Sequence, residues 1–85
     1  MELSARDRAI LDFERSWWQL SGRKERAIRA RLQISSTRYY RRLGELLDEP
    51  AAFAYDPLTV KRLRRDRDER RRARYEGRRA DPGTR

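Results

Sequence analysis

The sequence predicts an all-α protein in which a core of three helices is followed by a basic C-terminal helix. The first observation is size: 85 residues with 36% hydrophobic side chains suffice for one compact helical unit, but not for a β-sandwich or a doubly wound sheet. Second, apolar residues recur at the three- and four-residue spacing of amphipathic helices. Third, Ser or Asp precedes most of these apolar runs, as expected of residues that cap helices.

The first expected helix spans residues 5–18. Ser4 and Asp7 resemble a capping box, with Asp in place of the usual Glu. The apolar stripe of this helix has helical spacing: Ile10, Phe13, Trp17 and Leu20. We therefore expect Trp17 to lie in the core and Trp18 at the edge of the core.

The second and third expected helices follow closely. Ser21 and Gly22 break the first helix, and Ser21 is expected to cap the second one, over residues 23–33. Ser35 is a natural N-cap for the third helix. That helix has its own apolar stripe: Tyr39, Leu43, Leu46 and Leu47. Pro50 is expected to end it, because proline continues a helix poorly.

Residues 50–57 are expected to form a loop whose Phe53 and Tyr55 fold back on the core. Asp56 followed by Pro57 is a signal for the start of a helix. The last apolar residues of this helix lie in its first turns: Leu58, Val60 and Leu63. Beyond them the sequence has no hydrophobic face, so we expect a solvated helix that orders on a partner.

Charge divides the chain into two parts. Residues 1–56 carry eleven basic and nine acidic side chains, whereas residues 57–85 carry twelve basic and five acidic ones. We therefore expect a core over residues 1–56, a basic helix or arm over residues 57–79 and a disordered tail over residues 80–85. With a net charge of +9, the chain is expected to bind a polyanion.

The composition also excludes several classes of function. The absence of Cys and His excludes thiol nucleophiles, His bases, structural zinc sites and disulfides. Acidic residues such as Asp7, Asp12 and Glu14 have the spacing of exposed helix residues, and no nucleophile accompanies a base. We expect no enzymatic activity, no cofactor and no metal. The N-terminus is too charged for a signal peptide, and no run reaches the ~18 apolar residues of a membrane span, so we expect a cytoplasmic protein without a membrane partner.

The stretch ISSTRYYRRL, residues 34–43, resembles the second half of many bacterial helix-turn-helix motifs. A hydrophobe follows the turn, a Ser caps the next helix and a buried hydrophobe comes five residues after the first one: Ile34, Ser35 and Tyr39. Tyr40 and Leu43 further resemble a TetR-type recognition helix. The sequence departs from the motif at Gln33, where a turn glycine is usual, and at Arg29, where a small residue is usual. The resemblance implies a tri-helical helix-turn-helix core.

A broader resemblance covers residues 3–72. The runs FERSWWQL, RYYRRLGELLD and DPLTVKRLRR are similar to a family of small actinobacterial proteins of unknown function that are described as helix-turn-helix-like. This resemblance implies a fold and no activity.

Candidate site residues follow from the expected third helix and from the arm. A recognition helix presents its first exposed side chains to base edges, which gives the base-contact set Ser36, Thr37, Tyr40 and Arg41. Basic residues around it and at the start of the arm are expected to contact phosphates: Arg23, Lys24, Arg38, Arg42, Lys61, Arg62, Arg64 and Arg65. The plainer alternative is that the hydroxyls only cap the helix and the arginines only solvate it.

These observations favour a protein that binds double-stranded DNA, either as a transcriptional regulator or as a small nucleoid-associated protein located on the nucleoid. One alternative is an RNA- or ribosome-binding protein that uses the arm for phosphates. Another is an adaptor that docks on RNA polymerase through an aromatic patch of Trp18, Phe53 and Tyr55. The oligomeric state stays open.

Overall fold

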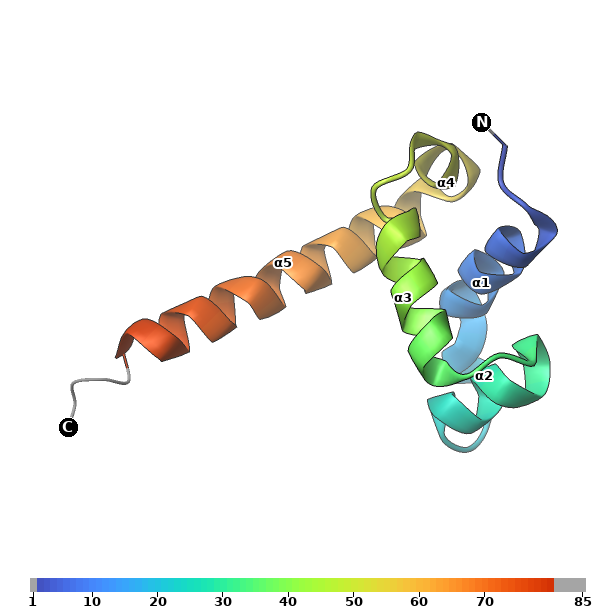
Figure 1. Ribbon diagram of the computed structural model, residues 1–85, viewed down its shortest axis with the longest axis horizontal. Helices are drawn as coiled ribbons and strands as arrows, with labels where there is room; N and C mark the ends of the chain where they lie inside the picture. The colour runs from blue at the N-terminus through green and yellow to red at the C-terminus, as the bar shows by residue number, and fades with distance from the viewer. Residues whose placement is uncertain (1, 81–85) are drawn as a thin grey trace.

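The computed structural model describes residues 2–80, with side chains described as far as Tyr75. Its elements are α1 (Ala5–Ser16), the short 3-10 helix η1 (Trp17–Gln19), α2 (Lys24–Leu32), α3 (Ser36–Leu46), α4 (Pro50–Tyr55) and α5 (Pro57–Ala80). All regular structure within the described range is helical, which confirms the all-α prediction. The first four helices form a body from which α5 projects (Figure 1), so that the chain measures 50 × 31 × 21 Å.

Three helix starts have the caps that the sequence predicts. The side chains of Ser4, Ser35 and Asp56 each accept a hydrogen bond from a backbone N–H three residues further along, at 3.0, 3.2 and 3.2 Å respectively. Such a side-chain bond satisfies an amide that has no partner within the helix. The expected cap at Ser21 is wrong, because α2 begins at Lys24 and its N-cap, Arg23, makes no side-chain capping bond.

The first helix ends two residues earlier than predicted. After Ser16 the chain tightens into η1, which has three residues per turn instead of 3.6. Trp17 stays partly buried against the core, as its place in the apolar stripe predicts. The prediction for Trp18 is wrong: the change of pitch leaves it 54% exposed rather than at the core edge.

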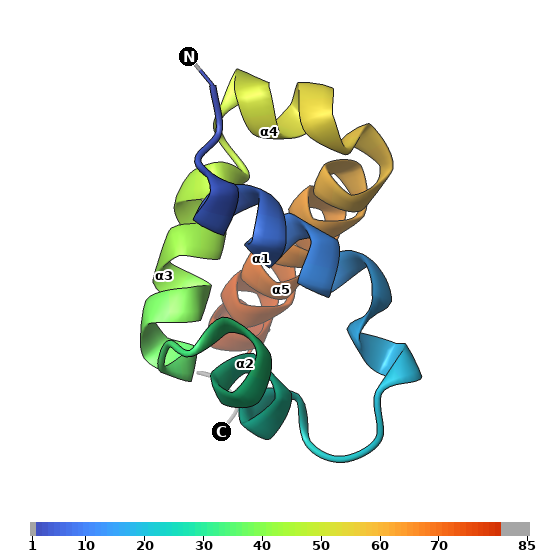
Figure 2. The same ribbon diagram turned by 90° about the vertical axis from the view of Figure 1, so that its right-hand side faces the viewer.

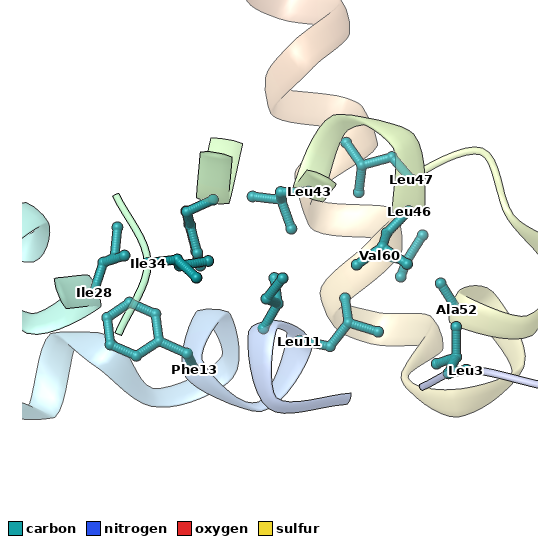
Figure 3. Packing of buried hydrophobic residues seen from close by; sticks show 12 residues of the cluster. Leu3, Leu11, Phe13, Ile28, Ile34, Leu43, Leu46, Leu47, Ala52 and Val60 are labelled. Atoms are coloured by element: carbon teal, nitrogen blue, oxygen red, sulfur yellow. The ribbon is translucent and has the colours of Figure 1, made fainter. Parts of the chain in front are cut away.

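The core is an elongated cluster around α1. Figure 3 shows Phe13, Ile28 and Ile34 at one end of it and Ala52 and Val60 at the other. Figure 2 shows α1 crossing in front of α5 with α3 on one side and α2 below. Because α1 contacts every other helix, it is the element that positions α3 and α5 relative to each other.

The expected loop over residues 50–57 is wrong, because these residues contain α4. α3 ends at Leu46, before the expected end at Pro50, and Pro50 instead begins the next helix, where its missing N–H leaves no helix bond unmade. Ala52 is the residue that α4 buries. Phe53 and Tyr55, which were expected to fold onto the core, remain exposed.

The basic C-terminal segment is one continuous helix of 24 residues, although the sequence predicts order only on a partner. Arginine is a good helix former, and Asp or Glu three or four residues from Arg supports a solvated helix. Thr59 and Val60 are buried, whereas Leu58, an expected apolar contact, is 78% exposed. The disordered tail was expected to begin at residue 80, but Ala80 still belongs to α5. The rest of that prediction, residues 81–85, lies outside the described residues.

Candidate nucleic-acid interface

A tight turn joins α2 to α3. Gln33 adopts the left-handed conformation, with φ of 60°, and its N–H donates to the Arg29 carbonyl at 3.0 Å. This is the position where the helix-turn-helix motif has glycine, the residue that reaches positive φ without strain. Arg29, the other departure from the motif, is exposed and so its side chain does not separate the two helices. Ile34 is buried directly after the turn.

The outward side of α3 presents what we call the free face of α3: Thr37, Tyr40, Arg41 and Gly44, all exposed. A Cβ at Gly44 would meet no atom within 4 Å, so the surface next to this residue is unobstructed. Of the predicted base-contact residues, Thr37, Tyr40 and Arg41 lie on it, whereas Ser36 is half-buried at the helix start. The ring of Tyr40 packs edge-on against buried Tyr39, with centroids 5.0 Å apart.

Behind α3 lies a buried carboxylate. Glu14 is 1% exposed, and Lys24 Nζ lies 2.7 Å from its Oε2. The Tyr39 hydroxyl donates to the same oxygen, and Arg62 lies 3.8 Å from the other one. Burial, followed by the hydrogen bond to Glu14, raises the pKa of Tyr39 above its ordinary value. We call these four residues, Glu14, Lys24, Tyr39 and Arg62, the Glu14 hub.

The Glu14 hub engages two residues that were predicted to contact phosphates. Lys24 is 18% exposed and also lies over the Trp17 and Tyr40 rings, at 4.8 and 5.2 Å from their centroids. Arg62 donates to the Glu14 carbonyl at 3.1 Å and covers the Trp18 ring. Both side chains thus join helices within the body. The expected exposure of Glu14 is wrong, although its position four residues after Ile10 and three after Leu11 places it on the apolar side of α1.

Two more of the predicted phosphate contacts are half-buried and bonded to other parts of the protein. Arg42 donates to both carboxylate oxygens of Asp7, at 2.9 and 2.8 Å, and to Glu45 at 2.8 Å. The hydrogen bond with Arg42 lowers the pKa of Asp7, which is buried rather than exposed as expected. Arg64 donates to the Leu47 carbonyl at 2.7 Å. These bonds tie α3 to α1 and to α5.

The remaining four predicted phosphate contacts are exposed: Arg23, Arg38, Lys61 and Arg65. Arg38 shares a hollow of about 230 Å³ with Arg6, a basic residue that the sequence analysis missed. Arg6 lies in the first turn of α1, where the helix dipole favours acidic residues. A basic residue is unusual at such a position, and this is the signal in the sequence that could have identified Arg6.

The expected aromatic patch does not form. Trp18 packs with Arg62, at 5.5 Å from its ring centroid, and Phe53 packs with Arg64 at 5.4 Å. Those two arginines are two residues apart on α5, so they point to roughly opposite sides of the helix, about 200° apart. Tyr55 donates instead to Asp12 on α1 at 2.8 Å. The three aromatic residues therefore have three separate surroundings.

The described residues contain no group of three or more acidic side chains placed to hold a metal ion. Over the same range, no helix has the length and apolar character needed to cross a bilayer. Comparison with protein families matches residues 2–75 to a family described as "Protein of unknown function (DUF3263)". No curated protein and no solved structure matches the chain.

Proposed function

The chain belongs to the DUF3263 family of proteins of unknown function, and we propose that it binds double-stranded DNA with α3 in the major groove. The observation that carries this proposal is the two-sided character of α3. One side buries Tyr39, Leu43 and Leu46, and the other is the free face of α3. The order of α2, tight turn and α3, braced by α1, supports a tri-helical helix-turn-helix assignment.

The free face of α3 has the chemistry that base edges require. Thr37 is short enough to let the backbone approach a base pair, and its hydroxyl can donate or accept. Arg41 follows one turn later and is suited to the O6 and N7 acceptors of guanine. Gly44 removes bulk from the next turn. The major groove, about 12 Å wide, admits a helix with such a face.

Phosphate contacts would flank this helix. Arg38 and Arg6 lie around one hollow beside α3, and Arg23 precedes α2. Arginine forms two parallel hydrogen bonds with a phosphate, which fixes the orientation of a protein on a duplex. The net charge of +9 supplies attraction that does not depend on sequence. This combination is compatible with a transcriptional regulator and with a small nucleoid-associated protein in the cytoplasm.

RNA or a ribosome remains the main alternative partner, because arginine-rich helices also bind RNA. A role as an adaptor for RNA polymerase has less support, since Trp18, Phe53 and Tyr55 do not form a common patch. Competition between duplex DNA and duplex RNA of equal length separates the first alternative from the proposal. Pull-down of polymerase after nuclease treatment tests the second.

The direct test is fluorescence anisotropy with a labelled duplex at several salt concentrations. If about six phosphates are contacted, the logarithm of affinity falls against the logarithm of salt with a slope near −5. Selection of preferred sequences then compares Arg41→Ala with Arg15→Ala, which removes the same charge from an exposed position on α1. We expect Arg41→Ala to relax one base position at a cost of about 1–3 kcal/mol. Absence of duplex binding at low salt, or preference for RNA, refutes the proposal.

A further inference from the structure

The face of α5 that packs on the body continues beyond the body. Thr59 and Val60 are buried, and Leu63 packs against the core. Steps of three and four residues along the same side of the helix then lead through arginines only: Arg64, Arg67, Arg70, Arg71 and Arg74. We call these five residues the arginine face.

The acidic residues of this segment lie elsewhere on the helix. At about 100° per residue, Asp66, Asp68 and Glu69 lie roughly 90° or more from the centre of the arginine face. They share the other side of α5 with Arg65 and Arg72. Over residues 64–75, charge is thus largely segregated: one side carries five arginines and no carboxylate, and the other carries three carboxylates against two arginines. At the boundary, Arg67 lies 3.7 Å from Asp68.

The arginine face begins beside α3. Arg64 bonds the Leu47 carbonyl, and Arg67, 22% exposed, lies 3.4 Å from Asp48. Asp48 lies in the turn directly after α3, two residues beyond Leu46. Figure 1 shows α5 leaving the body past this end of α3. The two surfaces therefore adjoin at a corner whose walls are α3 and α5.

Five like charges on one side of a helix repel one another at spacings of three and four residues. A polyanion along the arginine face would relieve this repulsion where the face extends beyond the body, at Arg70, Arg71 and Arg74. Each guanidinium group can donate hydrogen bonds to two oxygens of one phosphate, and it is more weakly hydrated than an ammonium group. Phosphate is therefore an anion that arginine suits well. The helix α5 places these guanidinium groups along one side, with successive turns about 5.4 Å apart. This side lies next to α3, the helix that we assign to the major groove.

We infer that the exposed part of the arginine face, Arg70, Arg71 and Arg74, binds the phosphate backbone of the same DNA duplex that α3 reads, while Arg64 and Arg67 anchor α5 to the body, so that the corner between α3 and α5 is one DNA-binding surface. This inference rests on the proposed function and adds which side of α5 makes contact. The opposite side of α5, with its carboxylates, then points away from the duplex.

The test compares two double variants of the full chain with equal charge. Arg70→Ala with Arg74→Ala removes two exposed residues of the arginine face, and Arg15→Ala with Arg72→Ala removes two exposed residues outside it, one on α1 and one on the other side of α5. Duplex binding is measured by anisotropy at several salt concentrations, and circular dichroism checks that helix content is equal. Loss of two phosphate contacts should make the salt slope shallower by about 2 in the first variant. The second should stay close to the wild type.

The outcomes separate this inference from the proposal on which it rests. Equal losses in both variants, with the wild type still bound to the duplex, show that these arginines act only through the total charge of the protein and overturn the inference. An unchanged slope in the first variant also overturns it, and α3 keeps its proposed role. If the wild type binds no duplex, the proposed function itself fails. If the arginine face matters for duplex RNA but not for DNA, the inferred partner is wrong.

Discussion

Replacement of Glu14 should lower stability more than replacement of any exposed carboxylate in the chain. In the native state this side chain is 1% exposed, accepts a hydrogen bond from Tyr39 and pairs with Lys24 at 2.7 Å. Glu14→Gln keeps the volume and leaves an oxygen for the Tyr39 hydroxyl. It removes the charge that faces Lys24, whose ammonium would then lie in a largely buried position without a carboxylate.

The magnitude follows from the burial of Lys24. Breaking a fully buried ion pair by removing one partner costs about 3–5 kcal/mol. Lys24 is 18% exposed and also lies over the Trp17 ring, so its ammonium keeps some stabilising contact, and we expect Glu14→Gln to cost about 2 kcal/mol. Glu14→Ala also leaves a void and an unpaired Tyr39 hydroxyl, which raises the expected loss to about 4 kcal/mol.

Urea denaturation followed by circular dichroism measures both losses as shifts of the midpoint. Glu25→Gln is the matched control, because Glu25 is an exposed carboxylate in the first turn of α2 and should cost no more than about 0.5 kcal/mol. A Glu14→Gln variant as stable as the Glu25→Gln variant would refute the assignment of Glu14 as a structural hub. So would a loss below about 1 kcal/mol for Glu14→Ala.

Four further outcomes are expected. Because folding raises the pKa of Tyr39, the stabilisation from this residue is present below the ordinary value of 10.0 and is lost as pH rises above it. The urea midpoint of the wild type should therefore fall at alkaline pH more than that of Tyr39→Phe. Because Arg42 lowers the pKa of Asp7, that contribution is present above the ordinary value of 3.8 and is lost as pH falls below it; the difference between wild type and Asp7→Asn should therefore shrink in acid. Ser35→Ala should cost about 1 kcal/mol in thermal or urea denaturation, and an unchanged midpoint would show that the cap is dispensable. Gln33→Gly should stabilise the chain by up to about 1 kcal/mol, since glycine adopts positive φ without strain, and a loss of stability would contradict this account of the turn.

Local signals in the sequence identify much of this fold. Ser4, Ser35 and Asp56 cap helices because each acts on an amide three residues away, so a short window of sequence contains the whole interaction. The packing side of α3 is equally local, because apolar residues repeat at helical spacing. Such features need no knowledge of tertiary contacts.

Features that depend on distant partners escaped the sequence analysis. Glu14 is buried because Lys24, Tyr39 and Arg62 converge on it from three other helices, and no window around residue 14 contains them. The ion pair of Asp7 with Arg42 joins residues 35 positions apart. In the candidate site, helical periodicity predicted which side chains of α3 are exposed. It could not predict that arginines such as Arg64 bond to other parts of the protein.

The segregation of charge on α5 bears on how the protein would organise long DNA. A helix that is basic all round can lie between two duplexes and join them, and many such links fold a chromosome into a compact mass. Here the side of α5 opposite the arginine face carries more carboxylate than guanidinium over residues 64–75 and would repel a second duplex. A protein that binds through one side of α5 only would cover one duplex or occupy a single site on it, and would not link neighbouring segments of DNA.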